Sequence, residues 1–387
     1  MKSVPAWWWL SCLLVRWRRA WHNEQARFVH DNNINTLRFI GAFLVLFGHA
    51  FVLCYGPGGG EDPISDWLMR YTGYRAKLPG LGVAMFFVLS GYLVTRSYVS
   101  RHNLLVYLEA RVLRIYPALW VTLLFTVCIL GPLASSLSVG DYFAHPATWH
   151  YLEYNAKLFP DVIYRLPGSF PDNPRPGGVN GSLWSLPVEV RMYLIVAALG
   201  VFGVLRRRWA FNLVAVGIVV FYVVAPEHFF LLPELRRERV GVYFLLGALC
   251  YINRDVLVLH WAGVLLLGTV AAISFSYGKT FYNLLFAIWF CYLTLYIAFH
   301  QRIRLPDLGS RGDFSYGLYL YAFPMTQLGI MLLGPEHPWL IVVTTFISSM
   351  LLAVLSWRYI EQPCLRLKGK LPAGLKNLFD SRRRTAR

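Results

Sequence analysis

Hydrophobic residues occur in long runs along this chain, and short polar stretches separate them. A run of about 20 apolar residues is long enough to cross a bilayer as a helix. Ten such runs occur, near residues 37–56, 79–97, 115–137, 184–205, 210–226, 239–252, 256–275, 280–299, 313–334 and 338–357. The pattern therefore predicts an all-α fold, in a polytopic membrane protein with about ten transmembrane helices.

The composition of the chain supports this interpretation. Hydrophobic residues make up 57% of its 387 residues and charged residues only 15%, whereas soluble domains carry about 25% charged residues. Tryptophan is abundant, with 14 residues, as is typical of proteins with two membrane–water interfaces. The six cysteines are scattered and show no spacing that suits a metal site. The sequence therefore predicts neither a disulfide framework nor a bound metal.

The positive charges alternate between the two sides of the expected bundle. The net charge is +17, which would suggest a nucleic-acid partner if the basic residues formed one patch. Instead, one set of loops together with both chain ends carries 25 Lys and Arg residues, and the opposite loops carry 10. Because cytoplasmic loops are enriched in Lys and Arg, we expect both termini in the cytoplasm and no nucleic-acid partner. The RRER cluster at 236–239 lies on the less basic side, against this layout.

This layout divides the chain into three segments. Residues 1–35 hold a tryptophan-rich apolar patch followed by a basic cluster, which predicts an uncleaved segment at the cytoplasmic face of the bilayer. Residues 36–365 form the transmembrane domain. Residues 366–387 form a basic cytoplasmic tail, whose charge suits anionic lipid.

Two polar side chains interrupt the first span, TLRFIGAFLVLFGHAFVL. Arg38 and His49 are eleven residues apart, so they lie within roughly 20° of one helix face and about 16 Å apart along the axis. A snorkelling arginine and a separately buried histidine would explain them without a site. A shared face instead suits one long ligand, anionic at Arg38 and reactive at His49. Because histidine exchanges protons near neutral pH, His49 is the candidate general base.

Further polar and small residues flank the next two spans. Ser90 and Gly91 interrupt the second span near mid-bilayer. Small residues there allow close helix packing, or they let a thin substrate pass beside a hydroxyl. Before the third span, Arg111 and Arg114 are neighbours on one helical face. Positive-inside topology explains two such arginines, and a phosphate clamp with Arg38 is the functional alternative, since Arg forks match phosphate oxygens.

The longest external loop ends in NGSLWSLPVEVRMYL, where the fourth span begins. Glu189 lies about two turns inside that span, at a depth similar to that of His49. Arg191 follows at i+2 and points to a different face, so we expect Glu189 to orient His49. Ser182 or Ser185 can cap the helix, and Ser185 and Trp184 are also candidate contacts for an acceptor that enters from the external loop.

The motifs occur in an order that resembles the acyltransferase-3 family of integral membrane O-acyltransferases. The resemblance covers about residues 30–365. It rests on Arg38-x10-His49, FFVLSGY, RVLRIYP, SLWSLPVE, GDFSYGLYLYAFP and SWRYIEQP. In one departure, Ala322 stands where a histidine often follows the Leu-Tyr pair. In another, we expect none of the extracellular hydrolase-like domain that some members append.

The resemblance implies an inner-membrane enzyme. Such an enzyme takes an acyl group, usually acetyl, from cytoplasmic acyl-CoA and delivers it to a sugar hydroxyl of an exported or surface glycan, such as O-antigen or exopolysaccharide. Acyl-CoA is then a donor substrate, and no permanently bound cofactor is expected. The resemblance implies a catalytic set of His49, Glu189 and Ser90. It also implies an acyl-CoA-binding set of Arg38, Arg111, Arg114 and Gly91.

The rival class is a proton-coupled transporter of a sugar or of a lipid-linked substrate. Buried Arg, His and Glu residues would suit such a carrier as well. Inverted repeats with broken helices would favour it, and the sequence shows none. A non-catalytic scaffold would not need Arg38 and His49 on one helix face.

Overall fold

The computed structural model describes residues 32–72, 76–224, 240–300, 302–310 and 312–370. Within these ranges every regular element is a helix, apart from two isolated β-bridges. The prediction of an all-α fold is confirmed. Most of the expected N-terminal segment, the RRER cluster and most of the basic tail lie outside the described residues.

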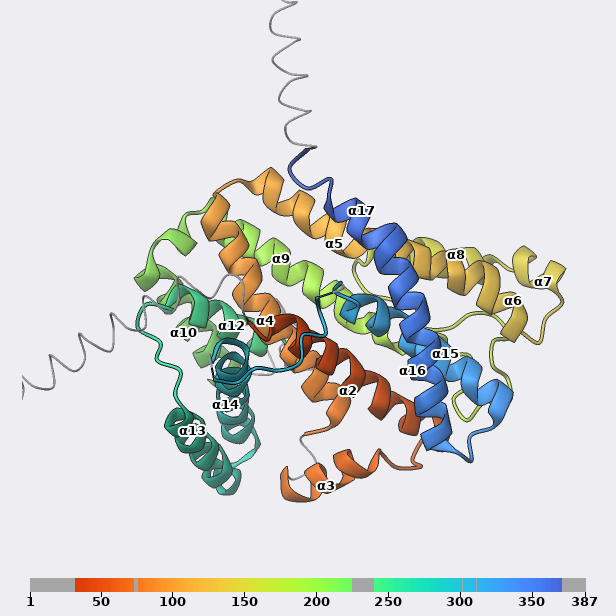
Figure 1. Cartoon of the computed structure of the whole chain (residues 1–387), viewed down its shortest axis with the longest axis horizontal. Coiled ribbons are helices and arrows are strands. Elements are labelled where there is room, and N and C mark those ends of the chain that lie inside the picture. Colours follow the sequence, from red (N-terminus) through yellow and green to blue (C-terminus); the bar gives the residue numbers. More distant parts are fainter. Residues whose placement is uncertain (1–31, 73–75, 225–239, 301, 311, 371–387) are drawn as a thin grey trace, which may run out of the picture.

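Each of the ten expected segments contains a helix (Figure 1). These helices are α2 Ile34–Tyr55, α4 Leu78–Arg101, α5 Leu104–Phe125, α9 Ser185–Val201, α10 Arg208–Val224, α12 Val240–Ile252, α13 Trp261–Ile273, α14 Lys279–Phe299, α15 Ser315–Leu333 and α16 Pro338–Ser356. By length and composition, six helical stretches of the described chain can cross a membrane, and three further apolar helices are shorter. The chain is thus a polytopic helical protein, and the number of ten spans stays a prediction.

Short elements connect the long helices. They are α3 Pro63–Thr72, η1 Thr126–Leu130, α6 Gly131–Ala134, α7 Val139–Ala144, α8 Pro146–Lys157, η2 Gly181–Trp184, η3 Val204–Arg206, η5 Ser274–Tyr277, η6 Trp357–Glu361 and α17 Gln362–Leu365. Helices α6, α7 and α8 belong to the long segment between α5 and α9 and lie together at one edge of the molecule (Figure 1).

Helix α4 packs between α2 and α12, and glycines bring the backbones together. A Cβ atom on Gly82 would lie 2.4 Å from the carbonyl oxygen of Gly41 in α2. A Cβ atom on Gly91 would lie 2.1 Å from the carbonyl oxygen of Phe244 in α12. Small residues allow such close approach in membrane bundles. The packing interpretation of Gly91 is therefore the one that the structure supports.

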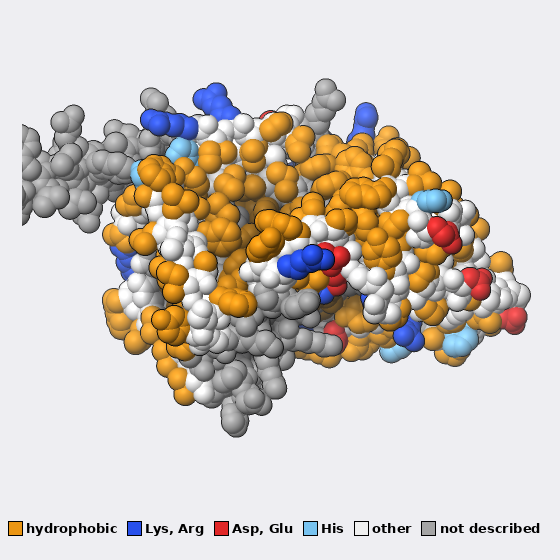
Figure 2. Space-filling model, turned by 90° about the horizontal axis from the view of Figure 1, so that it is seen from below, with side chains coloured by type: hydrophobic (Ala, Val, Ile, Leu, Met, Phe, Trp, Pro, Cys, Tyr) orange, Lys and Arg blue, Asp and Glu red, His pale blue; other side chains and the backbone are white. Residues whose placement is uncertain are grey.

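The outer surface of the bundle is strongly apolar. Hydrophobic side chains cover much of the face in Figure 2, and few charged side chains interrupt them. Outward positions of several helices carry exposed large side chains, among them Leu124, Val220, Leu266, Val343 and Ile347. Apolar surface of this extent marks an interaction site such as a membrane, which agrees with the hydropathy of the helices.

Candidate functional site

A cavity of about 600 Å³ lies among α2, α4, α5, α9 and the segment that precedes α15. It gathers residues that are far apart in the sequence. The candidates that line it are Arg38, Ser90, Arg111, Arg114, Ser185 and Glu189. The described residues that line it do not include His49, Gly91 or Trp184. The structure therefore brings six of the nine candidates into one site.

Two of the three arginines are already paired with acids. Arg114 Nη2 lies 2.6 Å and Arg38 Nη1 lies 3.2 Å from the same oxygen, Oδ2 of Asp313. Arg114 Nη1 is also 3.8 Å from Glu361 Oε2. Asp313 and Glu361 together place two carboxyl groups beside the two guanidinium groups. This arginine–acid cluster is therefore largely neutralised from within the protein.

Arg111 has a different environment. Its guanidinium carbon lies 5.4 Å from the ring centroid of Tyr193, and its buried Nε has no hydrogen-bond partner among the described residues. Lys368 also lines the cavity, and partial burial together with Arg101 and Arg111 lowers the pKa of this lysine. The acid Glu109 lies close enough to Lys368 to offset part of this charge. This part of the cavity keeps an excess of positive charge, which suits an anionic ligand.

Glu189 forms a hydrogen-bonded group with two hydroxyls inside the cavity. Its Oε1 accepts from Ser90 Oγ at 3.2 Å and from the hydroxyl of Tyr193. Tyr193 follows Glu189 by four residues, on the same face of α9. Arg191 points elsewhere and donates to the carbonyl oxygen of Pro160. The partners of Glu189 are therefore hydroxyl groups on α4 and α9.

His49 lies apart from this group. Its ring packs edge-on against Phe323, with the ring centroids 5.4 Å apart. Its buried Nδ1 has no hydrogen-bond partner in the described part of the chain. Arg175 lies near enough to act on His49 electrostatically, and its guanidinium donates to the carbonyl oxygens of Val52 and Gly56 at 3.2 and 3.4 Å. The environment of His49 is thus aromatic, with one cation at the C-terminal end of α2.

The expected contact between Glu189 and His49 is therefore wrong, and helix register explains why. The contact of Gly41 with Gly82 sets the register of the antiparallel helices α2 and α4. From this contact, His49 lies about 12 Å along α2 and Ser90 lies about 12 Å along α4 in the opposite direction. Glu189 bonds to Ser90 and so shares its end of the bundle. Residue counting gives depth within one helix, but it does not give the register between helices.

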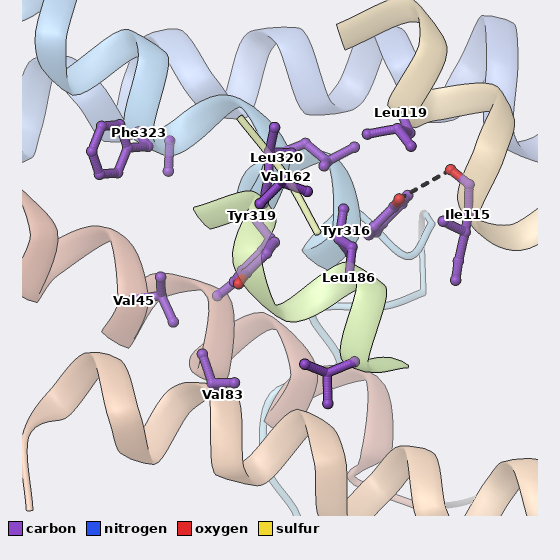
Figure 3. Packing of buried hydrophobic residues seen from close by; sticks show 14 of the residues in the cluster. Val45, Val83, Ile115, Leu119, Val162, Leu186, Tyr316, Tyr319, Leu320 and Phe323 are labelled. Carbon is purple, nitrogen blue, oxygen red and sulfur yellow. Dashed lines mark hydrogen bonds between the residues drawn. The ribbon is translucent and has the colours of Figure 1, made fainter. Parts of the chain in front are cut away.

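A layer of buried side chains lies between the cavity and His49. Val45 of α2 and Val83 of α4 face Tyr319 of α15 (Figure 3), and each of the three is at most 5% exposed. Val83 and Tyr319 also line the cavity. Phe323, one turn further along α15, contacts His49. A ligand that extends from the cavity to His49 must pass this layer.

Ser185 belongs to the cavity, but it does not cap α9. Its Oγ lies 2.7 Å from the hydroxyl of Tyr319, which in turn donates to the carbonyl oxygen of Ser182 at 2.8 Å. The side chain of Asn180 accepts from the backbone N–H of Ser182 and caps the short turn η2. Trp184 ends that turn and lies outside the cavity lining in the described residues. The expectation that Ser182 or Ser185 caps α9 is wrong, because η2 precedes the helix and neither serine side chain caps it.

Three residues of the site, Tyr193, Asp313 and Lys368, were missed in the sequence. The signal for Tyr193 was present, because its i+4 spacing from Glu189 places both on one helical face. Asp313 lies within the GDFSY motif, but its partner Arg114 is 199 residues away in the sequence. Nothing in the local sequence distinguishes Lys368 from the other basic residues near the C-terminus.

The fold and the site define a polytopic helical membrane protein with a cationic internal cavity that holds a hydrogen-bonded serine and glutamate. No cluster of three or more metal-ligating side chains occurs in the part of the chain that the structure describes. The sequence profile of the acyltransferase-3 family, described as an acyltransferase domain, matches residues 31–358. The chain belongs to this family and is a membrane O-acyltransferase.

Comparison with curated proteins gives relatives that match most of the chain. It is 25% identical over 353 residues to an O-acetyl transferase of Shigella phage Sf6, across 86% of this chain and 96% of that protein. It is 27% identical over 375 residues to Nodulation protein 10 of Rhizobium leguminosarum bv. viciae, across 89% and 96%. It is 24% identical over 343 residues to the O-acetyltransferase OatA of Staphylococcus aureus, across 75% and 53%. No solved structure shows a significant match.

Proposed function

We propose that this enzyme transfers an acetyl group from cytoplasmic acetyl-CoA to a sugar hydroxyl of a surface or exported glycan. The names of two relatives, an O-acetyl transferase and an O-acetyltransferase, support the acetyl group. The observation that supports acetyl-CoA as the donor is the cavity, in which Arg111 has no acidic partner among the described residues and Lys368 lies nearby. The apolar helices support a membrane setting for the enzyme.

Coenzyme A has phosphates at one end, a thin amide-bearing arm and a reactive thioester at the other end. We assign the first phosphate contact to Arg111 and Lys368, since a guanidinium fork matches phosphate oxygens. Arg38 and Arg114 line the same cavity, and Asp313 already neutralises part of their charge. They therefore contribute the smaller share of donor affinity. The phosphates stay at the cytoplasmic end and never cross the bilayer.

The catalytic residues in this proposal are His49, Glu189 and Ser90, and they act at two separate places along the path of the donor. Glu189 and Ser90 contact the donor arm in the cavity. His49 takes the proton of the acceptor hydroxyl, whose oxygen attacks the thioester carbonyl, and the C–S bond breaks. The sulfur takes up the proton that His49 had accepted, and coenzyme A leaves as the free thiol. The acyl end of the arm reaches His49 through the buried layer of Val45, Val83 and Tyr319.

The acceptor approaches from the side opposite to the donor, in this proposal. The segment between α5 and α9 forms the external surface, and Trp184 and Ser185 stand where that segment enters the bundle. The enzyme resides in the inner (plasma) membrane with both termini in the cytoplasm. The uneven distribution of Lys and Arg residues supports this orientation.

The test uses inverted membrane vesicles, whose cytoplasmic face is outward, from cells with and without the protein. Radiolabelled acetyl-CoA is added outside, and base-labile label in the glycan fraction is counted. The label should appear only with the intact protein, and base-labile acetyl esters should be missing from the surface glycans of a deletion strain. Equal labelling in both membranes, or unchanged esters in the deletion strain, would overturn the proposal.

A further inference from the structure

Tyr193 is a buried residue of the cavity whose side chain makes two separate contacts. Its hydroxyl donates to Oε1 of Glu189. Its ring faces the guanidinium of Arg111, with the guanidinium carbon 5.4 Å from the ring centroid. The whole residue is only 5% exposed. One side chain therefore contacts both the cationic part of the cavity and its carboxylate.

Tyr193 is itself held firmly in place. The hydroxyl of Tyr107, a fully buried residue of α5, donates to the backbone carbonyl oxygen of Tyr193 at 2.9 Å. The ring of Tyr107 packs edge-on against Tyr98 of α4, with the centroids 5.3 Å apart. Contacts to α5 and α4 thus fix the backbone from which the Tyr193 side chain projects. A rigid support of this kind is what a preorganised site requires.

The carboxylate of Glu189 needs such a support because a competing partner is near. Arg38 lies close enough to attract Glu189 electrostatically. The two hydroxyls of Tyr193 and Ser90 hold Oε1 on the α4–α9 side. No described residue donates a hydrogen bond to Oε2 of Glu189, so this oxygen is left to accept from an N–H group of a ligand.

We propose that Tyr193 is a positioning residue that couples the two functions of the donor cavity. Its ring orients Arg111 toward the donor phosphates, and its hydroxyl keeps the Glu189 carboxylate turned toward the donor arm and away from Arg38. This inference rests on the proposed function and names a further residue of the same site. It assigns the two contacts of one side chain to two measurable quantities, donor affinity and transfer rate.

Two substitutions separate the contacts. Tyr193→Phe keeps the ring beside Arg111 and removes the hydroxyl, so acetyl-CoA should bind as in the wild type while acetyl transfer falls roughly tenfold, as expected for a lost hydrogen bond to a charged group. Tyr193→Leu removes the ring as well, and acetyl-CoA affinity should also fall several-fold, on the order expected for a cation–π contact. Binding is measured by calorimetry on the purified protein, and transfer is measured in the inverted vesicles.

Tyr142→Phe is the matched control. It removes the hydroxyl of another fully buried tyrosine, which donates to the carbonyl oxygen of Val127, and Tyr142 is not among the described residues that line the cavity. It should lower the melting temperature about as much as Tyr193→Phe and leave both binding and transfer unchanged. A double-mutant cycle tests the route of action, since residues that act together are not additive. Adding Tyr193→Phe to Glu189→Gln should cause little further loss of rate.

The outcomes distinguish this inference from the proposed function. If wild-type vesicles transfer no acetyl group, the proposed function fails. If they do, and Tyr193→Phe matches Tyr142→Phe in rate, or if the double variant shows fully additive losses, the positioning role is overturned. Should Tyr193→Phe not accumulate in membranes, Glu189→Asp tests the same bond, because it withdraws the carboxylate from Tyr193 by one methylene. It should then lower the rate as Tyr193→Phe would, and an unchanged rate would contradict the inference.

Discussion

The two ends of helix α2 carry the two polar residues of its span in opposite environments. Arg38 lies in a cavity, beside a carboxylate that it shares with Arg114. His49 lies against an aromatic ring, and its buried Nδ1 has no hydrogen-bond partner among the described residues. The comparison shows that one helix face can hold a charged side chain and a titratable side chain in very different surroundings. A permanently charged side chain needs a partner inside the bundle, because burying an unpaired charge is costly. A neutral imidazole can be buried without such a partner.

The difference between the two ends of α2 leads to a prediction for His49, whose substitution should cause the largest loss of acetyl transfer. His49→Ala should lower acetyl transfer by about 100-fold or more, the usual contribution of a general acid–base residue. Acetyl-CoA affinity should not change, because His49 does not line the described cavity. Rates come from the vesicle assay and affinities from calorimetry. His150→Ala, at an exposed histidine of α8, is the control, and a parallel loss of donor affinity in His49→Ala would remove the distinction between the two ends.

At the other end, Asp313→Asn should weaken the protein itself. Breaking a buried ion pair by removing one partner costs about 3–5 kcal/mol, and this carboxylate serves both Arg38 and Arg114. Asp313→Asn would leave both guanidinium groups without this shared carboxylate.

The melting temperatures of the wild type and Asp313→Asn in detergent provide the measurement. The variant should melt at a clearly lower temperature than the wild type. Asp307→Asn is the control, since Asp307 is exposed in the same loop and its carboxylate accepts from the backbone N–H of Gly309. Equal melting temperatures for the two variants would show that the cluster adds no stability.

Substitutions of Arg111 test which arginine of the cavity binds the donor. Arg111→Ala should lower acetyl-CoA affinity by about 10-fold to 100-fold, because a charge-assisted contact contributes about 1.5–3 kcal/mol. Arg111→Lys should also weaken binding, because lysine lacks the fork that matches phosphate oxygens. Acetyl-pantetheine, which lacks the nucleotide phosphates, should bind to Arg111→Ala and the wild type alike. An affinity loss that is the same for both donors would contradict the phosphate assignment.

Lys368 should show the smallest effect of the four. It is solvent-exposed and only partly covered by its neighbours, so its contact with an anion is screened by solvent and salt. We expect Lys368→Gln to lower acetyl-CoA affinity only a few-fold, about the size of a surface ion pair, and the difference from the wild type should shrink as ionic strength rises. Arg366→Gln, two residues away and outside the described cavity lining, should bind normally. Equal losses in the two variants would indicate a general effect of the basic segment.

The sequence predicted the helices well because each depends on a local property. A continuous apolar run must form a helix to satisfy its backbone in lipid, and so all ten segments, including the short α12, are helical. The site was predicted in part, since Arg38, Ser90 and Glu189 do meet in one cavity. The pairing of Glu189 with His49 was wrong because it required the register between two helices, which is set by contacts such as that of Gly41 with Gly82.

The glycines of α4 set a limit on how this enzyme can be altered. The helix touches α2 through Gly82 and α12 through Gly91, and neither position has room for even a methyl group. Ser90 therefore lies on a helix, α4, that can neither rotate nor shift without moving α2 and α12. Engineering for a longer acyl chain would have little success through α4. Substitutions would have to enlarge the cavity from α5 and α9, at side chains such as Ile115 and Leu186.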